Sequence, residues 1–379
     1  IFDMIREKDL LIHLPYESFD ESVVNFLYSA ANDKDVLAIK QTLYRVSSSS
    51  PVVQALEKAV QNGKQVTVLM EVKARFDEAN NILMARRLEK AGAHVIYGLV
   101  GLKTHSKCTL VIRREKDGIR RYVHVATGNY NASTAKLYTD LGILTCSDRV
   151  GIDASAFFNL LSGYSDPPIW DSFIVAPINL RQRCIELIDR EIHFAKNGED
   201  AHMIAKMNSL LDKGIIEKLY EASQAGVKIE LIVRGICVLI PGIPGVSDNI
   251  TVRSIVGRFL EHSRIFWFRN GGREELYISS ADWMPRNLND RVELMVPIED
   301  PEIKRRLKQM VDIELSDNQK AHIMQADGTW LKTISAENQL CAQEYFQKIA
   351  EKRDAEDEMT LAQKLEPYTP VLGHGDGSD

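Results

Sequence analysis

The chain has 379 residues, of which 45% are hydrophobic and 26% are charged. That composition excludes wholesale disorder and suits a protein with a sizeable core and about two domains. The formal net charge of −6 means that a polyanionic ligand would need a local basic pocket, because the molecule as a whole does not attract anions. Large basic stripes of the kind found in general nucleic-acid binders are not evident, so we expect no nucleic-acid partner.

The cysteines and the apolar runs indicate the cellular compartment to expect. Five scattered cysteines without a CxxC pair argue against a zinc site or a disulfide framework and favour a reducing, cytoplasmic compartment. No apolar run is long enough to span a bilayer, so we expect no transmembrane segment, and peripheral contact at the inner face of the membrane is an alternative. The sequence around Ile1 already reads as the middle of a domain, which we interpret as a fragment of a longer protein.

In the first half, apolar runs alternate with amphipathic segments. The pattern predicts strands at 35–46, 65–72 and 93–99, helices at 50–63 and 77–92, and a hairpin at 107–128. Ser50 and Pro51 mark the start of the first helix and Gly63 its end, and Asp117-Gly118 marks the hairpin turn. Such alternation favours an α/β fold.

The second half repeats the first. The corresponding segments are a strand at 201–207, a helix at 213–226 and strands at 227–235, 251–257 and 262–270. Each repeat is expected to end in a strand and a small-residue turn, "HVATGNYN" (124–131) and "LYISSADW" (276–283). We therefore predict two α/β domains, 1–170 and 171–335, joined by a Pro-containing linker at 162–179. The remainder, 336–379, is expected to be a polar helical tail that ends in disorder.

Two similar tripeptides occupy equivalent places in the repeats. His105-Ser-Lys107 and His262-Ser-Arg264 each precede an apolar strand. Paired imidazoles across a pseudo-twofold interface suit phosphoryl chemistry, in which one attacks phosphorus and the other manages charge or a proton at the leaving oxygen. Lys107 and Arg264 follow their histidines by two residues, so they share a strand face with them and are candidates to hold phosphate oxygens.

Three arginines follow predicted strands, where ligands of parallel α/β sheets gather. They are Arg45, Arg75 and Arg234, and we expect them in the pocket, with ion pairing to acids such as Glu71 as the alternative. The turn at 126–142 is rich in small residues and amides that can offer N–H groups to an anion. Tyr138 in this turn could stack on a base or hold a phosphate, and packing is its alternative role.

Together these stretches resemble the carboxy-terminal half of bacterial polyphosphate kinases. The resemblance covers about residues 3–335 and is carried by "LIHLPYESF", "AIKQTLYRVSSSSPVVQAL", "EVKARFDEANNI", "GLKTHSKCTLVIRRE", "HVATGNYNASTAKLYTDLGILT" and "EHSRIFWFRNGG". It implies two tandem phospholipase-D-like domains, each a mixed β-sheet flanked by helices and related by pseudo-twofold symmetry. It also implies ATP or ADP and inorganic polyphosphate as substrates, and a homo-oligomer in the full-length protein.

The resemblance assigns roles to particular residues. By "KTHSK", His105 is the histidine phosphorylated during turnover, and by "EHSR", His262 is its partner near the nucleotide phosphates, an acid or an electrostatic stabiliser. Arg45 ("LYRVSS") and Arg75 ("KARFDE") resemble the residues of a magnesium–phosphate site. Because a cationic side chain should not ligate a metal, we expect them to contact phosphates that carry Mg²⁺.

Further motifs extend this set to the nucleotide. Tyr138 ("AKLYTD") and Arg234 ("IVRGIC") resemble nucleotide-binding positions. Lys107, Arg264 and Arg291 ("NDRVE") are further phosphate contacts by the same resemblance. The implied reaction is reversible transfer of the ATP γ-phosphate to a polyphosphate chain through a phosphohistidine on His105, which must be neutral to attack.

One departure bears on the alternatives. The wider phospholipase D pattern places an Asp beyond each HxK, and here Ile112 and Arg269 stand in those positions. We read a site without these acids as favouring a polyanion over a lipid phosphodiester. A phospholipase-D-like phosphodiesterase remains one alternative, and a fragment that binds polyphosphate or nucleotide without turnover is the other.

Overall fold

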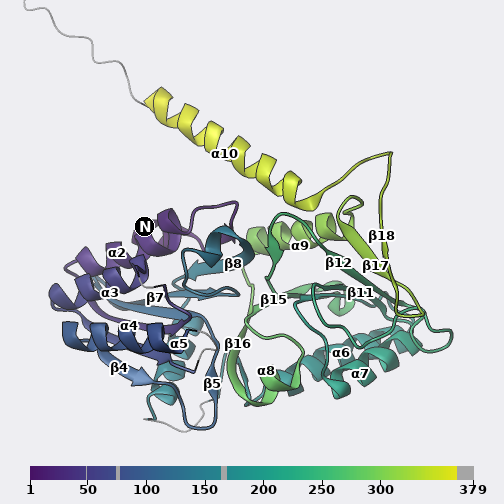
Figure 1. The fold of residues 1–379 in the computed structure, drawn as a ribbon, viewed down its shortest axis with the longest axis horizontal. Helices are drawn as coiled ribbons and strands as arrows, with labels where there is room; N and C mark the ends of the chain where they lie inside the picture. Colours follow the sequence, from purple (N-terminus) through teal and green to yellow (C-terminus); the bar gives the residue numbers. More distant parts are fainter. Residues whose placement is uncertain (48, 74–76, 164–168, 365–379) are drawn as a thin grey trace, which may run out of the picture.

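The computed structural model describes residues 1–47, 49–73, 77–163 and 169–364, and it shows two halves side by side, each built on a mixed β-sheet with helices on its faces (Figure 1). The strands of the first half are β1 (Leu10–Leu14), β2 (Val36–Tyr44), β3 (Gln65–Glu71), β4 (His94–Tyr97), β5 (Lys103–Thr104), β6 (Cys108–Glu115), β7 (Gly118–Ala126) and β8 (Tyr138–Thr145). Its helices are α1 (Phe2–Glu7), α2 (Asn25–Asn32), α3 (Pro51–Gln61), α4 (Glu78–Ala91) and α5 (Asp148–Leu161).

The second half follows the same plan. Its strands are β9 (Ile174–Ala176), β10 (His202–Met207), β11 (Lys228–Val233), β12 (Ile250–Ile255), β13 (Leu260–Glu261), β14 (Ile265–Phe268), β15 (Glu275–Ser279), β16 (Arg291–Pro297), β17 (Ala321–Met324) and β18 (Trp330–Lys332). Its helices are α6 (Leu180–Lys196), α7 (Lys213–Gln224), α8 (Pro285–Asn289), α9 (Pro301–Leu315) and α10 (Ala342–Lys364).

The order of strands confirms the duplication. The first sheet contains the run β8-β7-β6-β2-β3-β4, and the second contains β16-β15-β14-β10-β11-β12. Within both runs, the last three strands are parallel to one another and the others are antiparallel. The predicted α/β fold of two repeated domains is therefore confirmed.

Local sequence signals account for many of these elements. Ser50 caps α3 by accepting a hydrogen bond from the N–H of Val53, and Pro51 takes the first helical position, as predicted. Gly92 ends α4 at a φ of 104°, a left-handed conformation that favours glycine. The predicted hairpin is present as β6 and β7, with Glu115 paired to Gly118 across the turn.

Three expectations differ from the structure. The repeats do not end at the small-residue turns, because β8 and β16 follow them and complete the sheets. Ile174–Ala176, within the predicted linker, is strand β9. It pairs with β16, and its three apolar side chains are buried. The segment from 336 contains the predicted helix as α10, but Ala342 and Phe346 are buried in the core of the protein. The expected disordered end, 373–379, lies outside the described residues.

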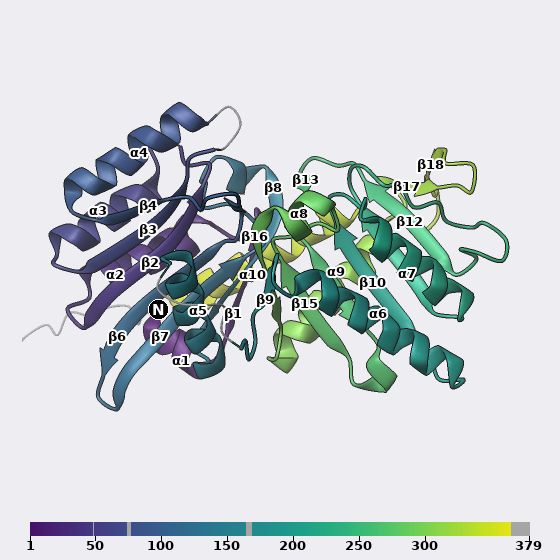
Figure 2. The same cartoon turned by 90° about the horizontal axis from the view of Figure 1, so that it is seen from below.

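Two very short strands exchange between the halves. β5 leaves the first half to pair with β16 of the second, and β13 leaves the second half to pair with β8 of the first. A shared apolar core lies beneath this exchange: Leu110 of β6, Phe157 of α5, Trp267 of β14 and Leu307 of α9 belong to one cluster. Helices α2, α3 and α4 cover the outer face of the first sheet, and α6 and α7 that of the second (Figure 2). Across the described part of the chain, helices that combine the length and the apolar character needed to cross a membrane are absent.

A lysine is buried in the second sheet between two carboxylates. Lys206 on β10 is 2% exposed, and its Nζ donates to Glu261 at 2.6 Å and to Glu314 at 2.5 Å. Burial alone would lower the pKa of Lys206, but these two carboxylates raise it above its usual value. The lysine therefore stays charged, and its positive charge offsets the cost of burying the carboxyl groups of Glu261 and Glu314.

Replacing this lysine tests that compensation. We expect Lys206→Met to lower the free energy of unfolding by about 3–5 kcal/mol, because it leaves the buried carboxylates without their cation. Lys213→Met is the matched control, since the Lys213 side chain is 89% exposed, and we expect it to change stability by less than about 0.5 kcal/mol. Urea denaturation of both variants measures the difference, and equal stabilities would contradict the account.

Candidate active site at the junction of the two halves

His105 lies between β5 and β6, where the two halves meet. Its backbone N–H donates to the carbonyl of Val292 at 2.9 Å, which fixes this peptide to β16. Its Nδ1 lies 2.9 Å from each carboxylate oxygen of Glu293. Glu293 is fully buried and also accepts hydrogen bonds from Ser280 Oγ and Asn287 Nδ2, both at 2.5 Å. The orientation of the His105 ring is thus set by a carboxylate that is itself held in place.

His262 is held in an equivalent way by residues of the first half. Its backbone N–H donates to Thr139 Oγ1 at 3.2 Å, and its Nδ1 lies 2.8 and 2.9 Å from the two carboxylate oxygens of Asp140. Asp140 is buried and accepts a further hydrogen bond from Thr127 Oγ1 at 2.6 Å. A Cβ at Gly128 would stand 2.2 Å from Asp140 Oδ2, so the close approach of this carboxylate requires glycine.

Each histidine therefore takes its carboxylate from the other half of the molecule. Glu293 is the third residue of β16 and Asp140 is the third residue of β8, so the two acids are equivalent in the repeat. The expectation of a site without acids is wrong: Ile112 and Arg269 do occupy the positions after the HxK pattern, but β8 and β16 supply the acids instead. The available signal was a single acid inside a largely apolar strand, in "YTDLGILT" and "RVELMVP".

These contacts select one tautomer of each ring. A carboxylate can only accept, so the proton of each neutral imidazole sits on Nδ1 and points at Glu293 or Asp140. Nε2 of His105 then carries a lone pair, and this nitrogen could attack an electrophile. Nε2 of His262 lies 3.2 Å from Nη1 of Arg264, a donor, so this nitrogen also acts as an acceptor in the free protein.

The charge state of His105 follows from its burial. Burial, together with the positive charges of Lys107 and Arg291, lowers the pKa of His105 well below its usual 6.5. Burial also lowers the pKa of Lys107 to about 7, although the charge of Glu293 opposes this. Burial raises the pKa of Glu293 to about 7, although Lys107 opposes that shift. His105 is consequently neutral at physiological pH, as a nucleophile must be.

The same forces act on His262. Burial lowers its pKa, with Asp140 opposing and Arg264 adding to the shift. The pKa of Asp140 is lowered in spite of burial, because His262, Thr127 and Arg264 favour its charged form. In the free protein His262 is therefore a neutral base whose acid role would require a proton gained on ligand binding.

Lys107 and Arg264 occupy equivalent positions beside the histidines. Lys107 is 2% exposed and its Nζ donates to the carbonyl of His105. Arg264 is 3% exposed, and its Nη1 donates to the carbonyl of His262 at 2.6 Å while its Nε donates to Asp282 at 3.1 Å. Arg264 thus places a buried positive charge beside His262, and Lys107 adds one beside His105 when its amine is protonated. In a protein of net negative charge, this is the local basic pocket that a polyanionic ligand would need.

The predicted nucleotide positions lie next to His262. The Tyr138 ring centroid is 5.2 Å from that of His262. Arg234 follows β11, and its Nε donates at 2.9 Å to Asn208, whose amide donates to the His262 carbonyl at 3.3 Å. Arg291 starts β16 at the place where Tyr138 starts β8, and its charge acts on His105. The structure thus gathers Tyr138, Arg234 and Arg291 around the two histidines.

Arg45 reaches the site from the end of β2. Its backbone has a φ of 57°, an uncommon conformation for a residue other than glycine, and its carbonyl accepts a hydrogen bond from Asn131 Nδ2 at 2.8 Å. Its guanidinium lies 5.6 Å from the Tyr44 ring centroid, and Tyr44 in turn packs edge-on against His105 at 5.1 Å. The Arg45 side chain is 42% exposed, and its Nε lies 3.4 Å from Asp77 Oδ2. Arg75, the other arginine predicted here, lies outside the described residues.

Glu71 has a different role from the ion pair considered above. Its carboxylate accepts hydrogen bonds at 2.9 Å from the backbone N–H groups of Lys73 and Thr104. Thr104 immediately precedes His105, so Glu71 fixes the backbone of the tripeptide.

The two buried acids of the site are already engaged by the imidazoles. Over residues 1–47, 49–73, 77–163 and 169–364, groups of three or more His, Cys, Asp or Glu side chains arranged to hold a metal ion are absent. Asp140 and Glu293 are engaged by the imidazoles, and Arg45 is a cation. Direct ligands for magnesium are therefore not shown among the described side chains.

Family models match both halves of the chain. Residues 1–167 match the family model described as polyphosphate kinase C-terminal domain 1, and residues 173–343 match the one described as domain 2. The chain is 60% identical over 321 residues to a polyphosphate kinase of Halalkalibacterium halodurans, covering 85% of this chain and 45% of the relative. It is 55% identical over 355 residues to one of Synechocystis, covering 93% and 49%.

Solved structures show the same relationship. A crystal structure of polyphosphate kinase from Porphyromonas gingivalis superposes with a TM-score of 0.87 at 39% identity, over 93% of this chain and 54% of that one. A phosphatidylserine synthase from Haemophilus influenzae superposes with a TM-score of 0.55 at 12% identity, over 94% and 95%, a likeness of fold alone. The chain spans about half the length of the curated relatives that it matches.

Proposed function

Because this chain belongs to the polyphosphate kinase family and corresponds to its carboxy-terminal half, we propose that it carries the site at which phosphoryl groups pass between ATP and inorganic polyphosphate. The single observation that carries this proposal is the buried His105–Glu293 pair, at 2.9 Å, beside the buried side chain of Lys107. A neutral imidazole with its Nδ1 proton held by a carboxylate is an activated nucleophile. The neighbouring cations suit a substrate that consists of phosphates.

The forward reaction has two steps. Nε2 of His105 attacks the γ-phosphorus of ATP, the P–N bond forms, and the bond to the β–γ bridging oxygen breaks to release ADP. The imidazole becomes positively charged, and Glu293 stabilises that charge through the Nδ1 proton. A terminal phosphate oxygen of polyphosphate then attacks the same phosphorus, the P–N bond breaks, and His105 returns to its neutral form with the chain one unit longer. The reverse sequence makes ATP.

The remaining residues of the site stabilise charge on the phosphates. Lys107 and Arg264 stand beside the histidines, and Tyr138 and Arg234 place the nucleotide near His262 in this proposal. Phosphate dianions would raise the pKa of His262, so the ring becomes imidazolium on binding and donates from Nε2 to a leaving or attacking oxygen. Mg²⁺ bound to the phosphates, near Arg45, would neutralise part of their charge.

An exchange assay tests the proposal and separates its alternatives. The chain and its full-length parent are incubated with MgATP and polyphosphate, and ADP, ATP, free phosphate and chain length are measured. We expect ADP formation that depends on polyphosphate, with growth of the polyphosphate chain and little free phosphate. Free phosphate, or cleavage of a model phosphodiester without nucleotide, would favour a phospholipase-D-like hydrolase. Binding of polyphosphate by the chain without turnover, while the parent turns over, would mean that the other half is required.

A further inference from the structure

The helix α10 starts in the second half of the molecule and runs out over the first half (Figures 1 and 2). Its start is fixed by the loop after α9, because the N–H of Ala342 donates to Asp317 Oδ2 at 2.8 Å. The N–H of Leu340 donates to Asn318 Oδ1, also at 2.8 Å. The first turn of α10 therefore has a defined place in the second half.

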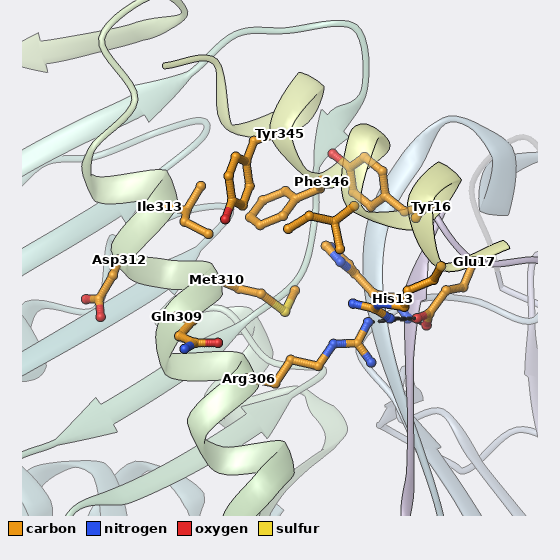
Figure 3. Close-up of a pocket in the computed structure, with 13 residues that line it drawn as sticks. His13, Tyr16, Glu17, Arg306, Gln309, Met310, Asp312, Ile313, Tyr345 and Phe346 are labelled. Atoms are coloured by element: carbon orange, nitrogen blue, oxygen red, sulfur yellow. Dashed lines mark hydrogen bonds and ion pairs between the residues drawn. The ribbon is translucent and has the colours of Figure 1, made fainter. Parts of the chain in front are cut away.

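The next turns of α10 contact the first half. The Phe346 ring centroid is 5.2 Å from that of His13 and 5.6 Å from that of Tyr16, and Arg353 donates to Glu17 at 2.9 Å. These side chains surround a cavity of about 370 Å³, to which Arg306 of α9 contributes (Figure 3). One helix thus touches both halves next to the place where β13 and β8 pair.

Gln343, in the first turn of α10, is tied to the segment that leads to His262. Its Nε2 donates to the carbonyl of Phe259 at 2.9 Å and to Glu261 Oε1 at 2.6 Å, and its Oε1 accepts from the N–H of Phe259 at 2.9 Å. Gln343 is 4% exposed, so both of its N–H donors and its acceptor are used inside the protein. A Cβ at Gly257 would stand 2.3 Å from Gln343 Oε1, which shows how closely the amide lies against this backbone.

The contact continues to the backbone of His262 through two further hydrogen bonds. Glu261 Oε2 accepts from Thr139 Oγ1 at 2.8 Å, and the same Oγ1 accepts from the N–H of His262 at 3.2 Å. Thr139 is followed directly by Asp140, the carboxylate that holds His262 Nδ1. Gln343 is therefore linked through Glu261 and Thr139 to the backbone of His262, and Thr139 is the neighbour of the carboxylate that orients the ring.

We propose that Gln343 is a positioning residue, through which α10 holds the segment 257–261 so that His262 stands against Asp140. Helix α10 then takes part in phosphoryl transfer through the position that it gives to His262. The predicted effect of Gln343 on turnover rests on the proposed function. Its predicted effect on the position of the His262 ring rests on the geometry alone.

The test uses the full chain and, for turnover, its full-length parent. Gln343→Met preserves the length of the side chain and removes all three hydrogen bonds. We expect kcat to fall about tenfold to a hundredfold with little change in the KM for ATP, because a displaced His262 binds substrate but serves the transition state poorly. Gln347→Met is the matched control: Gln347 lies one turn later on α10, its amide bonds to Glu351 at 2.9 Å, and we expect wild-type kinetics.

Two readouts separate positioning from general damage. In a His262→Ala background, Gln343→Met should cost nothing further, because the group through which it acts is gone. In NMR spectra of ring-labelled histidines, Gln343→Met should shift the His262 signals, whereas Gln347→Met should leave them in place. Should Gln343→Met not fold, Gly257→Ala is the second variant, since its Cβ displaces the same amide.

An equal loss of kcat in both backgrounds would overturn the proposal, and so would unchanged His262 signals in Gln343→Met. If the unsubstituted full-length protein shows no phosphoryl transfer, the proposed function fails, and the NMR comparison still decides the positioning role.

Discussion

A protein in which His105 is replaced by alanine is expected to lose phosphoryl transfer completely in both directions. The reason is chemical: Nε2 of His105 is the atom that forms the P–N bond in the proposed reaction, and its ring is oriented for that purpose by Glu293. Loss of a nucleophile costs on the order of 10⁶ in kcat where the consequence has been measured in other enzymes. ADP formation from ATP and polyphosphate, assayed with the full-length parent, gives the measurement.

His262→Ala is the informative comparison for this variant. The structure gives His262 an orienting carboxylate like that of His105, but its Nε2 faces Arg264. We expect His262→Ala to slow turnover by about 10²–10⁴, the range for loss of a positioned acid or base, and to leave slow phosphorylation of His105 intact. A variant His105→Ala with residual exchange, or a His262→Ala variant that cannot be phosphorylated, would mean that the two roles are assigned the wrong way round.

Glu293→Gln is expected to produce the second large effect, a loss of about 10³–10⁴ in kcat, which is the scale for removing the carboxylate that orients a nucleophile's histidine partner or base. Glutamine has the size of glutamate but can donate to Nδ1, which would move the proton of His105 to Nε2 and block attack. The pH dependence of kcat/KM tests the role of Glu293 more specifically. The pKa of Glu293 is raised to about 7, and that of His105 lies well below 6.5.

The sign of the pH effect follows from these values. As pH falls through about 7, Glu293 gains a proton and loses the negative charge that stabilises the imidazolium, while His105 is still neutral. We therefore expect kcat/KM of the unsubstituted enzyme to fall on the acid side of about pH 7, and Glu293→Gln to remove that limb. The control is Glu274→Gln, a half-exposed acid whose side chain contacts Arg269, which should keep the wild-type profile. An acid limb that persists unchanged in Glu293→Gln would contradict the role given to this carboxylate.

The sequence predicted the scaffold well where its signals are local. A few adjacent residues are enough to indicate the cap at Ser50, the turn at Asp117-Gly118 and the alternation of apolar runs. The structure contains the helix, the hairpin and the sheets that these signals predict. The matched tripeptides at His105 and His262 also stand out locally, and the structure places both at the junction of the halves.

Other parts of the site depend on contacts between distant segments. Glu293 is 188 residues from His105 and Asp140 is 122 residues from His262, so no short pattern joins either pair. The strands that bring them together, β5 and β13, have two residues each, which is too short for any periodicity to show. Gln343 lies beyond the repeat altogether, and only the fold reveals that it reaches Glu261.

The phosphohistidine itself can be tested by locating a phosphoryl group on the protein. The full-length parent is incubated with MgATP alone, and its mass is measured intact and, after digestion at neutral or alkaline pH, by peptide fragmentation. The account predicts the gain of one phosphoryl group that is lost in acid, that maps to His105 and not to His262, and that is discharged by added ADP or polyphosphate. A protein that turns over without this adduct, or that carries it on another residue, would contradict the account.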